Sequence, residues 1–432
     1  MKAVGGRPSV GALRIHLDNG LLVVARRNAA ARSVALRLAV EAGSAIDPPG
    51  RAGLAALMAR LLDRGAGPLG AEAIAERFDF LGVSYSVRAR RDSLDIEARL
   101  LAEHLPEVLG RLKLIASEPS FPEGEVRRER EQMLTAIAER DQDTAEVAEE
   151  ALAATLYPEA HPYHAPALGG RDSVAGITRD DLVAQHRRRL GPTGAVLAVC
   201  GDVDRERAAD LVAATFASWA PGGAGEQRTP IPEPPRPPGS SVVVRPIGGK
   251  TQADIALGIP PGVRRLSPDL PAALVLNNVL GEFGLGGRLG EAIREKGGLA
   301  YYAHSYFAAG IGAGPLVIRC GVAPDRVGRA VDLIRRTIDA VRRRGARPSE
   351  IRDSRQALAA AVPRRLETNA GCAAFLAECE FHGLGIDYPA RLPALIGAVD
   401  RAAVEAAATK YLNLERHVLV VAGPDLEEGT LR

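Results

Sequence analysis

The chain has 432 residues, which is too long for one hydrophobic core and predicts two or three domains. An apolar share of 46% and a charged share of 25% exclude an intrinsically disordered protein. The formal net charge of +2 gives no overall field that would draw the chain to nucleic acid or to an anionic membrane, so we expect neither partner.

The chain begins with a pattern typical of a β-hairpin. Apolar residues around Leu13 and the apolar run at 21–24 flank the turn-forming triplet Asp18-Asn19-Gly20. The segment 1–40 is rich in Lys and Arg, as transit peptides are, but the strand–turn–strand pattern favours a folded segment over a cleavable helix. No stretch has the roughly 18 uninterrupted apolar residues of a membrane span. We therefore expect a cytoplasmic protein.

The elements that follow form a pattern that occurs twice. In each half a strand leads to an Ala- and Leu-rich helix, a second strand leads to a long helix and a proline-marked turn, and a charged helix begins near Gly124 or Glu350. The two copies lie roughly 200 residues apart, which predicts one α+β unit present twice. The predicted strands are 34–40, 93–99 and 195–200 in the first half and 253–258, 316–322 and 418–422 in the second, and the predicted long helices are 105–115 and 327–342.

Prolines crowd the segment between the two copies. This composition over residues 221–241 predicts an extended, semi-rigid linker. The expected domains are therefore residues 1–220 and 242–432. The predicted fold class is α+β, with two homologous domains of about 200 residues, each an antiparallel sheet packed with helices. Paired halves of this kind are expected to enclose a central cleft.

The four cysteines are too few for a disulfide scaffold, and they lack the CxxC spacing of a zinc knuckle. A reducing compartment is the better expectation. They are Cys200, Cys320, Cys372 and Cys379.

Residues 42–55 read AGSAIDPPGRAGLA, and this stretch resembles the segment that leads into the zinc-binding helix of the M16 metallopeptidases, the pitrilysin and mitochondrial processing peptidase family. In that family the helix carries H-x-x-E-H, in which two histidines bind the metal and a glutamate acts as general base. Here positions 56–60 read ALMAR, so Ala56, Ala59 and Arg60 replace the ligands and the base. The family's third ligand is a glutamate further along the chain, and its position is Ala136, after Thr135.

Such a site cannot bind zinc in the way that the family does. Alanine offers no donor atom, and Arg60 places a cation where a dication would sit. The resemblance therefore implies the M16 (LuxS-like metallohydrolase) fold with a degenerate metal site, and we expect no cofactor in this chain.

Two other groups imitate metal ligands. Residues 100–104 read LLAEH, with Leu100 where the first histidine would be, and are typical of a helix start with exposed polar positions. His161-Pro162-Tyr163-His164 holds two histidines, but Pro162 precludes a regular helical ligand spacing, which favours a structural loop.

Residues 280–307 resemble the C-terminal signature of the same family, which is a glycine-rich loop, a helix ending in Arg-Glu-Lys, and a strand that begins Leu-Ala-Tyr. Arg294 and Tyr301 match the pair that contacts substrate in that family. Gly297 or Gly298 can adopt the left-handed conformation that ends the helix. The structural alternative is a helix-end arginine that complements the helix dipole and a half-buried strand tyrosine. By strand alternation, Tyr302, His304 and Tyr306 belong to the opposite face and are expected to pack.

The resemblance implies a function shared between two chains. Our leading hypothesis is a substrate-binding subunit that pairs with a zinc-bearing M16 subunit in a heterodimer, binds the peptide substrate, and supplies Arg294 and Tyr301 to the partner's active site. The alternative is a non-enzymatic M16 homologue that acts as a scaffold or peptide-binding module. A third hypothesis, a standalone zinc peptidase with a relocated site, would require stoichiometric zinc in the isolated chain.

Overall fold

The computed structural model describes residues 2–3, 11–220, 230–234, 237–282, 284 and 286–424. Within it the chain forms two compact units, each assembled from three separate segments. Unit 1 comprises Met1–Ile137, Pro166–Thr229 and Val362–Arg391, and unit 2 comprises Ala138–Ala165, Pro230–Ala361 and Leu392–Arg432. The boundary therefore does not fall only in the proline-rich segment, because each unit takes in a piece of the other half of the sequence.

Unit 1 is built on a seven-stranded sheet with strand order β1-β2-β3-β9-β4-β8-β7. Neighbouring strands are antiparallel except β3 and β9, which run parallel. The strands are β1 (Lys2–Ala3), β2 (Ala12–His16), β3 (Leu22–Arg27), β4 (Ser33–Val40), β7 (Ser84–Ala89), β8 (Leu94–Leu101) and β9 (Val196–Gly201). A separate two-stranded pair joins β5 (Gly65–Ala66) and β6 (Leu69–Gly70).

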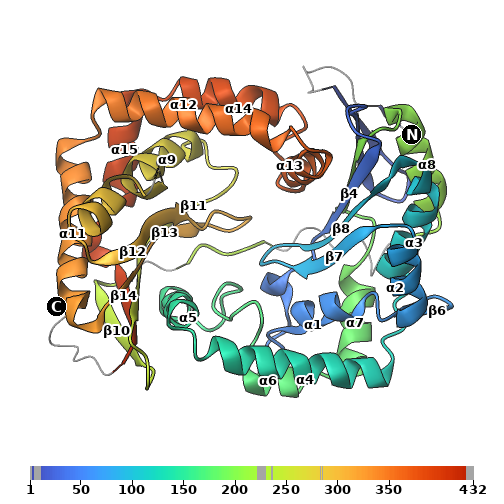
Figure 1. The fold of residues 1–432 in the computed structure, drawn as a ribbon, viewed down its shortest axis with the longest axis horizontal. Coiled ribbons are helices and arrows are strands. Elements are labelled where there is room, and N and C mark those ends of the chain that lie inside the picture. The colour runs from blue at the N-terminus through green and yellow to red at the C-terminus, as the bar shows by residue number, and fades with distance from the viewer. Residues whose placement is uncertain are drawn as a thin grey trace. The chain divides into compact units, whose positions relative to one another are not determined.

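The two faces of this sheet differ in chemistry. Alternate residues of β4, such as Val34, Leu36 and Leu38, are buried in one hydrophobic cluster with the apolar faces of the covering helices. The opposite face is apolar on β9, at Val196, Ala198 and Cys200, and polar on β8 and β7; one helix, α13 (Asn369–Phe381), packs on β4 and β9 there (Figure 1). The other helices of unit 1 are α1 (Leu54–Leu61), α2 (Ala71–Phe80), α3 (Leu105–Ser117), α6 (Arg171–Ala175), α7 (Arg179–Arg189) and α8 (Arg205–Phe216).

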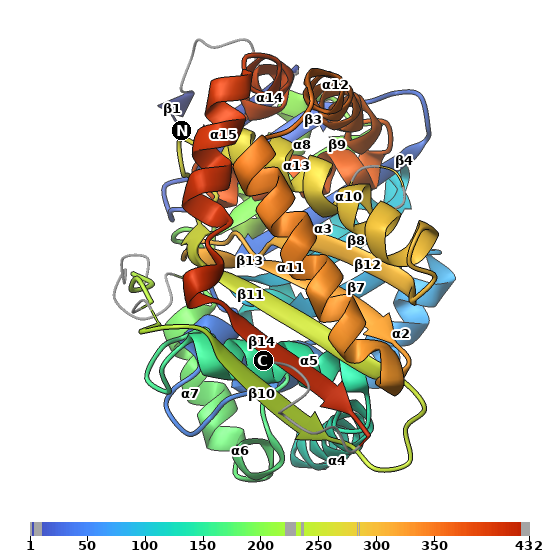
Figure 2. The same cartoon turned by 90° about the vertical axis from the view of Figure 1, so that its left-hand side faces the viewer.

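Unit 2 repeats this plan with a five-stranded sheet of order β10-β14-β11-β13-β12. It too has one parallel pair, β10 with β14, among antiparallel neighbours. One face carries α9, α11 and α15, of which α11 and α15 cross the sheet in the foreground of Figure 2, and the other face carries α5. The strands are β10 (Ser241–Pro246), β11 (Ala253–Val263), β12 (Ala300–Phe307), β13 (Gly314–Val322) and β14 (Val418–Gly423), and the helices are α5 (Thr144–Leu156), α9 (Leu270–Asn277), α10 (Gly287–Leu289), α11 (Val327–Arg344) and α15 (Arg401–Tyr411).

The predicted internal repeat is confirmed. β4 begins at Ser33 and its counterpart β11 at Ala253, and the step from β8 at Leu94 to its counterpart β13 at Gly314 has the same length. The sheets are mainly antiparallel, and the one parallel pair in each arises because the last strand of each half inserts between two consecutive strands, β9 between β3 and β4 and β14 between β10 and β11. Each half also donates one helix: α5 belongs to the first half but packs on the sheet of unit 2, and α13 does the reverse.

Three further helices join these parts. α4 (Glu123–Arg140) and α12 (Pro348–Arg365) each contain a unit boundary, at 137/138 and at 361/362, and each directly precedes a donated helix. α14 (Tyr388–Gly397) contains the boundary at 391/392.

The predicted N-terminal hairpin is confirmed by the antiparallel pairing of β2 with β3, from Ala12↔Arg26 to His16↔Leu22. Residues 221–229 and 235–236 of the predicted linker lie outside the described residues. Of the described linker residues, 230–234 pack on unit 2, because Ile231 is buried and the carbonyl of Pro232 lies 3.1 Å from Nε2 of His161.

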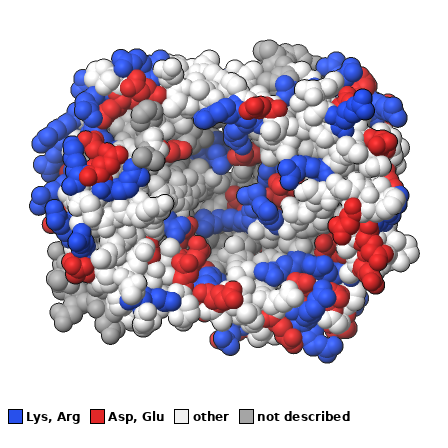
Figure 3. Space-filling model, in the orientation of Figure 1, with Lys and Arg blue, Asp and Glu red and all other residues white. Residues whose placement is uncertain are grey.

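Two properties of the described residues bear on the expected partners. None of the described helices is long and apolar enough to cross a membrane. On the face drawn in Figure 3, Lys and Arg are interspersed with Asp and Glu, in line with the near-balanced charge of the sequence.

Candidate functional site

The segment that resembles the family's zinc-helix entrance serves here to start α1. Asp47 accepts hydrogen bonds from the backbone N–H groups of Gly53 and Ala55, both at 2.9 Å, and so caps the helix. Burial raises the pKa of Asp47 to about 7, although the N–H groups of Ala55 and Gly53 oppose that rise. Gly53 has φ of 94°, and a Cβ there would lie 2.7 Å from the carbonyl of Leu168, so only glycine fits.

The degenerate metal positions on α1 hold an ion-pair cluster. Ala56 is half-buried and Ala59 is buried, while the Nη1 atom of Arg60 lies 3.9 Å from Oε2 of the buried Glu129 on α4. Oε1 of Glu129 also lies 3.2 Å from Nε of Arg64 and 3.4 Å from Nη2 of Arg128. Three guanidinium groups therefore surround one buried carboxylate.

Ala136, where the family has its third ligand, is half-buried on α4, two turns beyond Glu129. The side chains present do not fit zinc, because three alanines and a guanidinium offer no donor. Within the part of the chain that the structure describes, no group of three or more His, Cys, Asp or Glu side chains is placed to hold a metal ion.

The other imitations of metal ligands have structural roles. The ring of His161 is buried, stacks on Tyr157 with ring centroids 4.6 Å apart, and accepts the N–H of Tyr163 at Nδ1. His164 bonds the carbonyl of Tyr157 at 2.8 Å. His104 lies in a short 3₁₀ turn that leads into α3, and Leu100 is buried in β8.

In unit 2, the turn between Arg294 and Tyr301 follows the predicted geometry. The helical turn Gly290–Glu295 has wide, π-type hydrogen bonding, and it ends where Leu299 N–H bonds the carbonyl of Ile293 at 3.0 Å and Gly298 N–H that of Arg294 at 3.1 Å. Gly298 adopts the left-handed conformation, with φ of 60°. The chain then reverses into β12, which carries Tyr301.

Arg294 and Tyr301 line the same open pocket, of about 670 Å³, together with Gly281, Glu282, Gly284 and Gly286 of the glycine-rich loop. The side chain of Tyr301 is 93% exposed, so its hydroxyl is available to a ligand. The Nη2 atom of Arg294 lies 3.3 Å from Oε1 of Glu295, an exposed pair that a bound anion or carbonyl could replace at little cost.

The pocket has a second wall, formed by side chains that the alternation of residues along the strand predicted to pack on its opposite face. Tyr302, His304 and Tyr306 line it in a row, with successive ring centroids 5.6 and 6.2 Å apart. The register of β12 against β13 shifts between Ala300 and Ala303, which breaks the strict alternation that would separate Tyr301 from these rings. Because a bulge leaves no mark in periodicity, no signal in the sequence could have identified this wall.

Helix α5 fixes the aromatic row from behind. Tyr302 donates a hydrogen bond to the buried Asp254, which also accepts from Thr144 on α5 at 2.5 Å. Tyr306 donates to Glu149 on α5 at 2.6 Å, and Arg319 pairs with the same carboxylate at 2.5 Å. Burial, together with the nearby Arg319, lowers the pKa of His304, so its imidazole is neutral at pH 7.

The glycine-rich loop is held on both sides. Ser305 on β12 donates to Asn277 at 2.7 Å, and Asn277 donates to Glu282 of the loop at 2.9 Å. On the other side, Arg288 makes a two-pronged bond with Glu350 at 2.9 and 2.6 Å. The described part of the loop is therefore anchored to the strand that carries Tyr301 and to α12.

Two family models match the chain. The model described as Insulinase (Peptidase family M16) matches residues 22–166, and the model described as Peptidase M16 inactive domain matches residues 176–358. With this fold and these matches, the chain belongs to the M16 peptidase family. The match to the inactive-domain model supports an inactive-type M16 homologue, in line with the replaced residues at the metal-site positions.

Curated relatives fall on both sides of the division between peptidase and non-peptidase. An uncharacterized zinc protease of Streptomyces coelicolor is 28% identical over 332 residues, covering 75% of this chain and 71% of the relative. The non-peptidase homologue YmxG of Helicobacter pylori is 28% identical over 275 residues, covering 63% of this chain and 62% of the relative.

Solved structures show the same fold over nearly the whole chain. A peptidase M16 inactive domain from Pseudomonas fluorescens has a TM-score of 0.89 at 26% identity and covers 98% of this chain and 100% of that one. A protease from Helicobacter pylori, with a TM-score of 0.89 at 19% identity over 96% of this chain and 99% of that one, shares the fold.

Proposed function

We propose that this chain is the substrate-binding subunit of a two-chain M16 peptidase, and that a zinc-bearing M16 subunit is its partner. The observation that carries the proposal is the contrast between the two halves. The four metal-site positions hold no donor, whereas Arg294 and Tyr301 still line one open pocket. A chain that had lost all peptidase function would have no need to keep an exposed tyrosine beside an arginine at this turn.

The two side chains have complementary chemistry toward a peptide. The guanidinium of Arg294 can bind a backbone carbonyl or a terminal carboxylate through two N–H donors. The hydroxyl of Tyr301 can donate a hydrogen bond to the oxygen of the scissile carbonyl, where negative charge develops during cleavage. The aromatic row Tyr302, His304 and Tyr306 gives an apolar wall for peptide side chains.

The test is to co-purify the chain with a zinc-bearing M16 protein from the same host and to measure cleavage of a peptide library by the pair and by each chain alone. We expect cleavage by the pair only. In the pair, Tyr301→Phe should lower kcat by about 10²- to 10³-fold, since it removes one donor to the developing charge. Arg294→Ala should raise KM as well as lower kcat/KM.

Arg336→Ala is the matched control, because Arg336 is an exposed arginine of α11 with only a 4.0 Å pair to Asp332. It should leave both kinetic constants unchanged. Full activity in Arg294→Ala and Tyr301→Phe would refute the assigned roles. A stable homodimer that captures no zinc-bearing subunit would instead support the scaffold alternative.

A further inference from the structure

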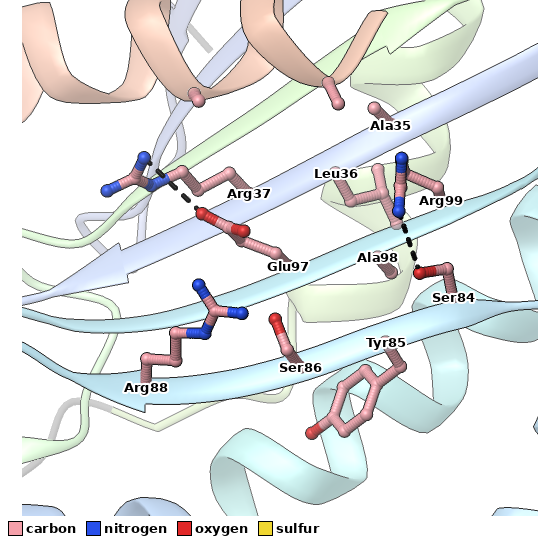
Figure 4. A pocket seen from close by; sticks show the side chains of 12 residues that line it. Ala35, Leu36, Arg37, Ser84, Tyr85, Ser86, Arg88, Glu97, Ala98 and Arg99 are labelled. Atoms are coloured by element: carbon pink, nitrogen blue, oxygen red, sulfur yellow. Dashed lines mark hydrogen bonds and ion pairs between the residues drawn. The ribbon is translucent and has the colours of Figure 1, made fainter.

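A second pocket, of about 270 Å³, lies wholly within unit 1, on the polar face of its sheet beside α13 (Figure 4). The pairing of β4, β8 and β7 places its side chains in cross-strand rows, with residues directly opposite one another. The rows are Ala39–Asp95–Arg88, Arg37–Glu97–Ser86 and Ala35–Arg99–Ser84.

Small residues keep this face open. Ala35 and Ala39 lie on β4, which α13 covers, and α13 contributes Ala370 and Ala374 to the lining of the pocket. Because none of these alanine side chains extends past Cβ, the space above β8 and β7 is left free for the longer polar side chains. The result is a recess floored by arginine and serine.

The charges of the recess are not balanced. The charge of Arg37 is paired, since its guanidinium lies 2.8 Å from Asp95 and 3.5 Å from Glu97, although its buried Nε has no hydrogen-bond partner among the described residues. Asp95 is saturated, because it also accepts from Arg90 at 2.5 Å and from Ser93 at 3.1 Å. Glu97 is therefore the only carboxylate among the lining side chains, against three arginines.

The two remaining arginines have no acidic partner among the described residues. Arg99 bonds only the hydroxyl of Ser84, at 3.2 Å, as Figure 4 shows. Arg88 has neither an ion pair nor a hydrogen bond within the described part of the chain. Both are free to bind an anion, and serine hydroxyls at 84 and 86 offer further donors beside them.

The spacing of the two arginines indicates the kind of anion. Arg88 lies directly opposite Asp95, and Arg99 lies directly opposite Ser84. Ser84 and Arg88 are four residues apart on β7, which at roughly 3.3 Å per residue separates them by about 13 Å. Guanidinium groups on rows this far apart can each bind one carboxylate of the same ligand, and their spacing suits two carboxylates rather than one compact anion. The volume lies just below the range of about 300–1,000 Å³ for drug-sized ligands, so the ligand is small.

We propose that this recess, with Arg88 and Arg99 as its ligand-binding cations, is a binding site for a ligand that carries two carboxylates. The same chemistry is offered by a free small dicarboxylic acid and by two acidic side chains of a peptide. The site is independent of the pocket at Arg294 and Tyr301, and its failure would leave the proposed function untouched.

Isothermal titration calorimetry at low ionic strength tests the proposal, with glutarate, acetate, inorganic phosphate and a blocked Glu-Ala-Glu peptide as separate probes. We expect glutarate or the peptide to bind at least tenfold more tightly than acetate or phosphate. Tighter binding of glutarate identifies a free acid, and tighter binding of the peptide identifies an acidic segment. Either result supports the two-carboxylate site.

Variants locate the binding. Arg88→Gln and Arg99→Gln should each weaken binding at least tenfold, and Arg99→Lys should have an intermediate effect because it keeps the charge but loses the fork. The matched control is Arg127→Gln, an exposed arginine of α4 in unit 1 outside the recess, which should change nothing. Absence of binding up to millimolar concentration, phosphate as the preferred ligand, or unchanged affinity in both glutamine variants would overturn the proposal.

Discussion

At the positions of the family's metal site, a cluster of ion pairs around Glu129 takes the place of a metal ion. A buried carboxylate on its own would be costly, and here Arg60, Arg64 and Arg128 balance its charge. The arginine side chains are each between 34% and 51% exposed, so water can solvate them if the carboxylate is removed. The carboxylate of Glu129 is only 4% exposed, so water could not solvate it if the arginines were removed.

This asymmetry predicts unequal effects of mutation. Glu129→Gln should lower the free energy of unfolding by about 1–3 kcal/mol, because the three arginines lose the carboxylate buried among them and only the more exposed Asp63 and Glu125 remain. Arg60→Ala should cost less than about 1 kcal/mol, since two arginines remain and its own contact is long. Urea unfolding of both variants measures the difference, and a larger loss in Arg60→Ala would contradict this view of the cluster.

Adjacent tyrosines on β12 should also behave differently. Tyr302→Phe removes a hydrogen bond to the buried Asp254 and should cost about 1–2 kcal/mol in urea unfolding. Tyr301→Phe should stay within about 0.5 kcal/mol of the parent, because that side chain is 93% exposed. Equal losses would show that the exposed ring has a structural role.

At this scale the sequence indicated some positions and missed others. The left-handed glycine after Arg294 could be predicted, since a helix that ends in Lys-Gly-Gly needs such a residue, and Gly298 adopts that conformation. The aromatic wall could not be predicted, because a register shift in one strand decides which rings share a pocket with Tyr301. The arginine partners of Glu129 were missed for a similar reason: they come from two helices, α1 and α4, and the short segment after α1, which meet only in the folded unit.

Among the elements, the end of the helix that carries Arg294 is set by two glycines with different requirements. A Cβ on Gly298 would meet nothing within 4 Å, so Gly298→Ala should cost about 1–2 kcal/mol from its positive φ alone. A Cβ on Gly297 would lie 2.6 Å from the carbonyl of Ile293, so Gly297→Ala should cost more and should displace Tyr301. Thermal unfolding gives the order, and Gly298→Asn, which tolerates the left-handed region, is the control.

The ion pair between Arg288 on α10 and Glu350 on α12, called the clamp below, should be lost in acid. Burial alone would raise the pKa of Glu350, but hydrogen bonds from Arg288 and Arg347 outweigh it and lower the pKa to about 2. Because the folded-state pKa lies below the usual glutamate value of 4.5, the clamp contributes fully above about pH 4.5 and its contribution disappears as the pH falls toward 2.

The difference in stability between the parent and Glu350→Gln should accordingly shrink across that window. Urea titrations at pH 6, 4 and 3 measure it. A difference that stays constant with pH would mean that the carboxylate is not ionised in the folded chain.

Long periodic elements were the most predictable from sequence. The strand expected at 34–40 spans Ser33–Val40, and the helices expected at 105–115 and 327–342 span Leu105–Ser117 and Val327–Arg344. The irregular helical turns Asn278–Glu282 and Gly290–Glu295 could not be predicted, because glycine-rich sequence fits many backbone paths and contacts with β12, α9 and α11 select this one.

For the whole molecule, repetition was readable from the order of elements, but the exchange of α5 and α13 was not. Periodicity identifies an amphipathic or apolar helix without naming the sheet that it will cover. The partner of α13 is β4, which lies near the opposite end of the sequence, and contacts so distant along the chain leave no local signal.

The exchange predicts that unit 1 cannot be isolated as the first half of the sequence. A chain that ends at Ala220 retains every strand of unit 1 but lacks α13, and it should bind the dye ANS and aggregate. Adding residues 362–391 as a separate peptide should lower the ANS signal. The control chain ends at Pro424, keeps all described elements and should fold; a soluble, compact 1–220 chain that binds no ANS would refute the prediction.

The donated helix α13 also sets a delay during synthesis. The last strand of the unit 1 sheet along the chain, β9, is complete at Gly201, whereas the segment whose helix α13 covers it ends only at Arg391. At about 5–20 residues per second, a ribosome needs roughly 10–40 s to cover that distance. For that time β4 and β9 present their uncovered face to the cell, so the yield of folded protein should depend on how fast the second half is translated and on which chaperones are at hand.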